Sequence, residues 1–333
     1  MTRQRLELSL ALSNNPNTRP LIDGHVEAEG VRLVPTAVHP SEMFWRQLKF
    51  AEFDVSEMSM SSLLIATSKA PTPWVALPVF TTREFFHTRM LVHTAAGIET
   101  PADLRGKRVG VPEFQQTAAI WGRGVLQHEF GVKTPEIEWF MERPADKSHG
   151  GATGTAAPAG VTIHQIPPST NIGEMLTTGE LDATLLYLTS PNLVDRSRID
   201  LSKDARVRPM FPDREAEGRR YYAKTGIYPI NHTVVVRRSL LEQHPWIALN
   251  LYSAFAEAKN EVARQGELYL RNYVTTGLIG DDVKRALAND PMAYGVRAAR
   301  NVLDTIGQYV HEQGLTVRRV GLEEIFAPST MDL

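Results

Sequence analysis

The segment from residue 108 to residue 131, RVGVPEFQQTAAIWGRGVLQHEFG, constrains the fold more than any other part of the chain. Val109 and Val111 predict a short buried strand, which Pro112 ends. Apolar residues then recur at helical spacing as far as Gly131, which is typical of the end of a helix. A strand that passes directly into a helix predicts an α/β protein in which this junction faces a cleft.

The start of this predicted helix is a candidate anion site. The first N–H groups of a helix have no partner within the helix, and they lie at the positive end of its dipole. Gln115, Gln116 and Thr117 add neutral side-chain donors at the same place. We therefore expect a small molecule that carries a carboxylate to bind there. An ordinary strand-to-helix turn in an α/β protein would give the same pattern.

The composition narrows the class of protein. A chain of 333 residues with 42% hydrophobic residues is long enough for two domains with buried cores. The 36 Lys and Arg residues nearly balance the 38 Asp and Glu residues, and they are dispersed, so neither nucleic acid nor a membrane surface is an expected partner. The absence of cysteine excludes disulfides and thiolate chemistry. A secretory signal peptide needs a continuous apolar run followed by a small-residue cleavage site. Glu7 interrupts the first apolar run and no such cleavage site follows, so we expect a cytoplasmic protein.

Two further groups of polar residues follow predicted strands. Thr18 and Arg19 lie just beyond the first strand, and Glu57, Ser59 and Ser61 lie at the end of the third. Ligands bind at the carboxyl ends of strands in open α/β sheets, so these residues are candidates for the cleft. The planar guanidinium of Arg19 suits a carboxylate. The alternatives are a solvated surface arginine and serines that cap the next helix.

The remaining segments predict the course of the chain. The pattern indicates a strand beginning at His87, and β-branched residues 233–236 predict a central strand. The small residues at 148–160, SHGGATGTAAPAG, predict a mobile surface loop. The character of the chain changes near residue 111 and again near residue 230, which indicates that it leaves one domain and later returns to it.

Four segments in this order resemble the 4,5-dihydroxyphthalate decarboxylase family: TRPLIDG, DVSEMSMSS, RVGVPEFQQTAAIWGRGVLQHEFGV and YYAKTGIYPINHTVVVRRS. The resemblance implies the two-lobed α/β fold of type II periplasmic binding proteins. Each lobe would be a mixed sheet flanked by helices, with the ligand cleft between the lobes. Residues 1–110 and 230–333 would form lobe 1, and residues 111–229 would form lobe 2.

The resemblance also implies a function, the conversion of 4,5-dihydroxyphthalate to protocatechuate and carbon dioxide. A histidine suits the transfer of a proton to the ring carbon, and His232 in the PINH segment is the first candidate, with His87 second. Glu57 and Glu113 are candidates for a base or an orienting group. The candidate substrate-binding residues are Thr18, Arg19, Ser59, Ser61, Gln116, Thr117 and Tyr228. No cofactor is required in principle.

Two other functions remain open at this point. The chain could be a non-catalytic binding protein for an aromatic or dicarboxylic acid. It could also be a lyase in which His87, His232, Glu57 and Glu113 hold zinc, manganese or iron, although the chain lacks a compact motif such as HExxH. A homo-oligomer is compatible with the sequence, and the expected partner is a small aromatic carboxylate.

Overall fold

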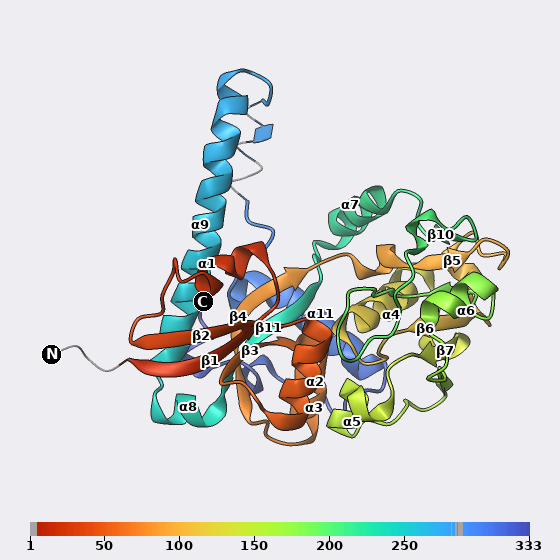
Figure 1. Cartoon of the computed structure of the whole chain (residues 1–333), viewed down its shortest axis with the longest axis horizontal. Coiled ribbons are helices and arrows are strands. Elements are labelled where there is room, and N and C mark those ends of the chain that lie inside the picture. Colours follow the sequence, from red (N-terminus) through yellow and green to blue (C-terminus); the bar gives the residue numbers. More distant parts are fainter. Residues whose placement is uncertain (1–4, 281, 284, 286–288) are drawn as a thin grey trace.

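The computed structural model of the chain describes residues 5–280, 282, 283, 285 and 289–333. These residues form two α/β lobes that lie side by side (Figure 1), and each lobe contains one mixed β-sheet. The two-lobed α/β fold expected from the sequence is confirmed.

The first sheet is built by both ends of the chain, in the strand order β2-β1-β3-β11-β4. Its strands are β1 (Leu6–Leu12), β2 (Val31–Ala37), β3 (Val55–Ser59), β4 (Trp74–Arg83) and β11 (Ile230–Arg237). The first three run parallel, whereas β11 is antiparallel to both of its neighbours, β3 and β4. The β-branched residues 233–236 are buried in β11, as expected for a strand inside the sheet.

The second sheet is built by the middle of the chain, in the strand order β10-β5-β9-β6-β7-β8. Its strands are β5 (Leu91–His93), β6 (Arg108–Val111), β7 (Glu138–Met141), β8 (Ile163–Gln165), β9 (Ala183–Thr184) and β10 (Val207–Pro209). Strands β6 to β9 pair in parallel, and β5 and β10 extend the sheet as antiparallel strands.

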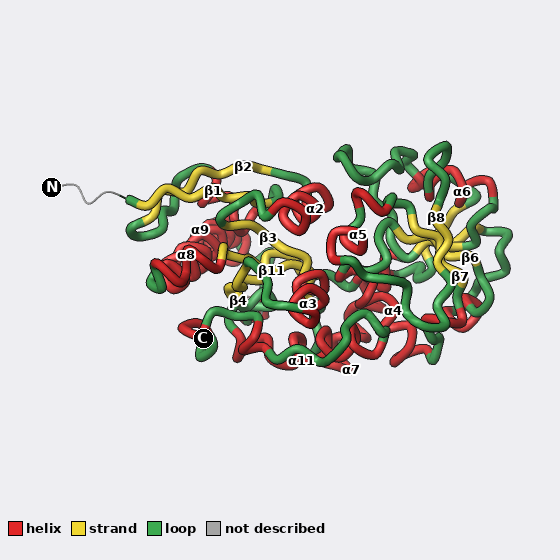
Figure 2. Tube along the Cα trace, turned by 90° about the horizontal axis from the view of Figure 1, so that it is seen from below, coloured by secondary structure: helices red, strands yellow, loops and turns green. Residues whose placement is uncertain are grey.

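Helices surround the two sheets, and Figure 2 shows them as the red segments around the yellow strands. They are α1 (Arg19–Ile22), α2 (Pro40–Phe50), α3 (Met60–Lys69), α4 (Thr117–Phe130), α5 (His149–Thr153), α6 (Ile172–Thr178), α7 (Arg214–Thr225), α8 (Arg238–Gln243), α9 (Ile247–Thr275) and α11 (Val296–Glu312). The second half of α9 projects from the body (Figure 1). Among the described helices, none is both long and apolar enough to cross a bilayer.

The chain passes from the first sheet to the second earlier than the sequence suggested. Strand β4 ends at Arg83 in the first sheet, and β5 begins at Leu91 in the second. Residues 91–110, which the sequence analysis assigned to lobe 1, therefore lie in lobe 2. A 3-10 turn, Phe86–Arg89, occupies the crossing, so His87 lies in this turn and not in the expected strand. The chain returns at Ile230, where β11 begins.

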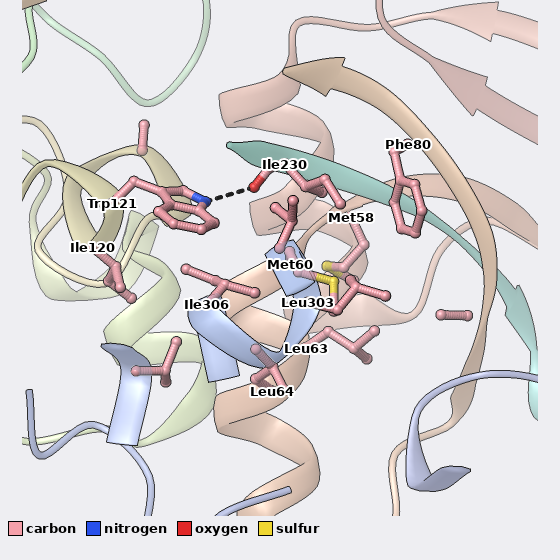
Figure 3. Close-up of a cluster of buried hydrophobic side chains, with 14 of the residues drawn as sticks. Met58, Met60, Leu63, Leu64, Phe80, Ile120, Trp121, Ile230, Leu303 and Ile306 are labelled. Carbon is pink, nitrogen blue, oxygen red and sulfur yellow. Dashed lines mark hydrogen bonds between the residues drawn. The ribbon is translucent and has the colours of Figure 1, made fainter. Parts of the chain in front are cut away.

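Helix α11 and the start of β11 join the lobes through apolar packing. Helix α11 contacts both α3 of lobe 1 and α4 of lobe 2. Figure 3 shows Leu303 and Ile306 of α11 among side chains from both lobes. There the indole N–H of Trp121 on α4 donates a hydrogen bond of 2.8 Å to the carbonyl oxygen of Ile230. One continuous hydrophobic core therefore joins the two lobes.

The contact between α4 and α11 depends on a glycine. A Cβ atom placed on Gly124 would lie 2.0 Å from the ring of Tyr309, which is an impossible distance. Gly124→Ala is therefore expected to lower the free energy of unfolding by about 1–3 kcal/mol in urea titrations. The matched control is Gly307→Ala on α11, where a Cβ meets open space. That change should stabilise the helix by up to about 1 kcal/mol, and equal effects of both changes would contradict the packing argument.

The prediction of a surface loop at residues 148–160 is wrong for the first part of this segment, whereas residues 154–160 have no helix or strand. Residues His149–Thr153 form helix α5, in which His149 is buried. The side chain of Lys69 on α3 fixes the end of this helix, because its ammonium donates hydrogen bonds of 2.8 and 3.0 Å to the carbonyl oxygens of Thr153 and Gly154. The backbone of α5 packs closely against the residues before it, and this contact requires a glycine. A Cβ on Gly151 would lie 1.8 Å from the carbonyl oxygen of Ala145.

Candidate active site

A cavity between the lobes is lined by histidine, arginine, glutamate and hydroxyl side chains that could contact a ligand. It is open to solvent, and its volume is about 680 Å³ with the solvent at its mouth included. Its walls come from both lobes and from the crossing segment that follows β4. The lining residues are His39, Pro40, Ser41, Phe44, Ser59, Glu84, Phe86, Arg89, Gln116, Thr117, Ala118, Arg143, His149, Leu186, Leu188, Asn231 and His232.

His232 and Glu57 form a buried acid–base pair at the lobe 1 wall. Register between the antiparallel strands β3 and β11 places them close together, and Nδ1 of His232 lies 2.9 Å from Oε2 of Glu57. Nε2 of the imidazole lies 2.9 Å from the side-chain amide of Asn231 on the cavity wall. Because the carboxylate accepts a hydrogen bond from Nδ1–H, it orients the ring so that Nε2 can exchange a proton with a ligand.

Glu57 is held as a carboxylate by its neighbours. It is fully buried, and it accepts hydrogen bonds from the backbone N–H and the hydroxyl of Ser13 at 2.7 and 2.6 Å, and from the hydroxyl of Thr81 at 2.8 Å. Burial alone would raise the pKa of Glu57, but the hydrogen bonds from His232 and Ser13 lower it. Glu57 therefore remains a fixed negative charge behind the imidazole.

The N-termini of α2, α3, α4 and α5 all reach the cavity. Their first residues or N-caps, His39, Ser59, Gln116 and His149, line its wall. The first-turn N–H groups of Ser61 on α3 and His149 on α5 already donate to Thr117 and Glu113, but the dipoles of the four helices add positive potential to the cavity. The cavity therefore favours ligands with more than one negative group.

A network of hydroxyl groups joins the two helix ends at the floor of the cleft. The hydroxyl of Ser59 in lobe 1 lies 2.9 Å from that of Thr117 in lobe 2. Thr117 also accepts a hydrogen bond of 3.0 Å from the backbone N–H of Ser61, whose hydroxyl donates to the carbonyl oxygen of Gln115 at 2.7 Å. This network holds the ends of α3 and α4 beside each other, so both face the same ligand.

Arg143 is a buried cation on the lobe 2 wall. It forms an ion pair with Asp195, with an Nε–Oδ1 distance of 2.6 Å, and it donates a hydrogen bond of 2.7 Å to the hydroxyl of Ser41 in lobe 1. Burial alone would raise the pKa of Asp195, but the ion pair with Arg143 lowers it. The guanidinium therefore stays charged at a place where a carboxylate of a ligand can reach it.

His149 lies beside this cation. Its Nδ1 is 3.1 Å from the hydroxyl of Ser62, and its backbone N–H donates to Glu113 at 2.8 Å. Burial, with the nearby charge of Arg143, lowers the pKa of His149 well below its usual value. Burial raises the pKa of Glu113. His149 is therefore a neutral imidazole near neutral pH.

The structure brings some of the candidate residues together and separates others. His232, Ser59, Gln116 and Thr117 line the cavity. Glu57, Ser61 and Glu113 lie one layer behind it, since they contact His232, Thr117 and His149 respectively. Thr18, Arg19, His87 and Tyr228 do not line it.

Arg19 and His87 have other partners. Arg19 is exposed on α1 and pairs with Asp23 at 2.8 Å, one helical turn away, so the interpretation of Arg19 as the carboxylate clamp is wrong. His87 is buried in the crossing turn with its Nε2 3.1 Å from Glu217 of α7. It packs against the ring of Tyr221, which indicates a structural role.

Thr18 and Tyr228 also make contacts within the fold. The hydroxyl of Thr18 donates to the carbonyl oxygen of Asn15 at 3.3 Å, within the same turn. The ring of Tyr228 packs on Phe85 with 4.9 Å between ring centroids, and Tyr228 is not among the residues that line the cavity.

Sequence reasoning missed several residues of the cavity wall. Arg143 and His149 gave no periodic signal, because their positions depend on Asp195 and Ser41, which are distant in the sequence. His39 precedes a proline at the start of α2, a pattern typical of a helix N-terminus, and this signal could have identified it. Among the described residues, no three His, Asp or Glu side chains gather at one point, so the four proposed metal ligands do not converge.

Known proteins resemble this chain at two levels. In overall structure it is similar to the alkanesulfonate-binding protein SsuA from Xanthomonas axonopodis pv. citri, with a TM-score of 0.56, 13% identity and coverage of 97% of this chain and 98% of that one. It is also similar to the periplasmic aliphatic sulphonate binding protein SsuA from Escherichia coli, with a TM-score of 0.53, 12% identity and coverage of 98% and 99%. These likenesses concern the fold alone.

Sequence comparison is more specific. No protein-family model matches the chain. A 4,5-dihydroxyphthalate decarboxylase from Comamonas testosteroni is 34% identical over 331 residues, which cover 98% of each chain. Another from Pseudomonas putida is 36% identical over 181 residues, covering 54% of this chain and 70% of the relative. Because the first similarity extends over both lobes, the chain belongs to the 4,5-dihydroxyphthalate decarboxylase family.

Proposed function

We propose that the protein decarboxylates 4,5-dihydroxyphthalate to protocatechuate and carbon dioxide, in the cytoplasm and without a cofactor. The observation that carries this proposal is the pair of His232 and Glu57 on the wall of a cavity that is rich in anion-binding groups. Family membership over the whole chain supports the same reaction.

The chemistry sets the groups that such a site needs. Direct loss of carbon dioxide would leave an aryl carbanion, which is too unstable to form in water near neutral pH. Protonation of the ring carbon that bears the carboxylate avoids this carbanion, because the hydroxyl group para to that carbon supplies electron density. Carbon dioxide then leaves with cleavage of the carbon–carbon bond, and the electron pair of that bond restores the aromatic ring. The site needs a proton donor and groups that fix the two carboxylates.

His232 is suited to deliver this proton. When the substrate displaces the amide of Asn231 from Nε2 and the imidazole is doubly protonated, Nε2 can donate to the ring carbon while Nδ1 remains hydrogen-bonded to Glu57. The negative charge of Glu57 offsets the positive charge of the imidazolium, and the hydrogen bond keeps the ring in one orientation. After the transfer, His232 is neutral and can regain a proton from solvent.

The remaining walls suit the rest of the substrate. The N-termini of α3 and α4, together with the guanidinium of Arg143, would hold the two carboxylates. Phe44, Phe86 and Leu186 offer apolar contacts for the ring. Phe44 also packs edge-on against His232, with 4.7 Å between ring centroids, and so limits the movement of the imidazole.

A direct assay tests the proposed function. Purified protein incubated with 4,5-dihydroxyphthalate should release carbon dioxide and yield protocatechuate in equal amounts, and prior treatment with a chelator should leave the rate unchanged. A binding protein would instead be stabilised by the compound without consuming it. Loss of activity on chelation, restored by a divalent metal, would favour the metal-dependent lyase.

A further inference from the structure

Glu84 is the one acidic side chain among the described residues that line the cavity. The two glutamates expected from the sequence to act there, Glu57 and Glu113, lie behind His232 and His149 and do not line it. Glu84 belongs to the crossing segment, where its backbone N–H donates to the carbonyl oxygen of Pro229 at 3.1 Å. This bond joins the two segments that connect the lobes, one after β4 and one before β11, so it fixes the backbone of Glu84 at the cavity wall.

The negative charge of Glu84 contrasts with the positive potential that Arg143 and the helix N-termini give to the rest of the cavity. Like charges repel, so a carboxylate on the wall disfavours a dicarboxylate ligand that approaches it with a carboxylate. Arg89 also lines the cavity and pairs with Glu84, with 2.6 Å between Nη1 and Oε1. Both side chains are partly exposed, at 42% and 38%, so solvent weakens this ion pair. Oε2 and the remaining lone pairs of Glu84 stay available to a ligand.

We propose that Glu84 accepts hydrogen bonds from the two neighbouring ring hydroxyl groups of the substrate and is a specificity-determining residue. This inference rests on the proposed function. An ionised carboxylate only accepts hydrogen bonds, and two adjacent hydroxyl groups present two donors to it. Glu84 thus favours the hydroxyl end of the ring and repels the carboxylate end, so that the ring enters in one orientation. The carboxylates then turn toward the helix N-termini and Arg143.

The test compares two ligands on variants that bind without turnover. In a His232→Gln background, calorimetry measures the affinity for 4,5-dihydroxyphthalate and for phthalate, which lacks both hydroxyl groups. Adding Glu84→Gln should weaken binding of 4,5-dihydroxyphthalate by about 10- to 100-fold, the size expected for losing hydrogen bonds to a charged group. It should leave phthalate binding unchanged or tighter, because a like charge is removed.

The control is Glu99→Gln in the same background. Glu99 also pairs with an arginine, Arg208 at 3.1 Å, but its side chain is 80% exposed and it does not line the cavity. This change should alter neither affinity.

Equal weakening of both ligands by Glu84→Gln would overturn the inference, because it would indicate a general effect on the cavity. Unchanged binding of 4,5-dihydroxyphthalate would overturn it as well. If neither ligand binds before Glu84 is changed, while the variant is folded, the proposed function fails and the inference fails with it.

Discussion

Replacing His232 with glutamine is expected to lower kcat by about 100-fold or more, while the affinity for 4,5-dihydroxyphthalate changes little. Glutamine can still donate a hydrogen bond to Glu57, so the buried carboxylate keeps a partner. It cannot carry the proton that the ring carbon needs. The rate is measured as release of carbon dioxide at saturating substrate, and the affinity is measured by calorimetry.

His164→Gln is the matched control for this variant. His164 also contacts a glutamate, with 2.7 Å between its Nε2 and Oε1 of Glu138, but it lies on β8 and both side chains are about 40% exposed, at 43% and 42%. The control should keep full activity. A His232→Gln protein that retains turnover would remove His232 from the mechanism.

Replacing Arg143 with methionine is expected to lower the free energy of unfolding by about 3–5 kcal/mol, because it leaves the buried carboxylate of Asp195 without its ion-pair partner. It should also weaken substrate binding, since the cavity loses its buried cation. Urea titrations give the first quantity, and calorimetry on the folded protein gives the second.

The double variant Arg143→Met with Asp195→Asn separates these two effects. Asparagine carries no charge, so most of the lost stability should return. Substrate binding should remain weak, because the guanidinium is still absent. Full recovery of binding in the double variant would show that Arg143 stabilises the fold alone and does not contact the substrate.

The local parts of this site could be predicted from the sequence. The strand-to-helix junction at residues 108–131 was recognisable because apolar residues have strand spacing before Pro112 and helical spacing after it. This junction places Gln116 and Thr117 on the cavity wall. His232 was recognisable because it lies beside the β-branched residues of an interior strand. In both places, neighbours in the sequence determine where the side chain lies.

Other parts depend on contacts that no local pattern records. Arg19 resembled a clamp, but Asp23 lies one turn further along the same helix and pairs with it. The small residues around His149 resembled a flexible loop, whereas Lys69 and Glu113 hold them in place. The crossing between lobes was placed near residue 110 because the strand at Leu91–His93 is short and pairs with strands distant in the sequence.

The most direct test is a crystal structure of the His232→Gln protein with 4,5-dihydroxyphthalate bound. The ring is expected between the lobes, with its carboxylates at the N-termini of α3 and α4 and near Arg143, and with one carboxylate-bearing carbon facing residue 232. Substrate bound outside this cavity, or with residue 232 remote from the ring, would contradict the account.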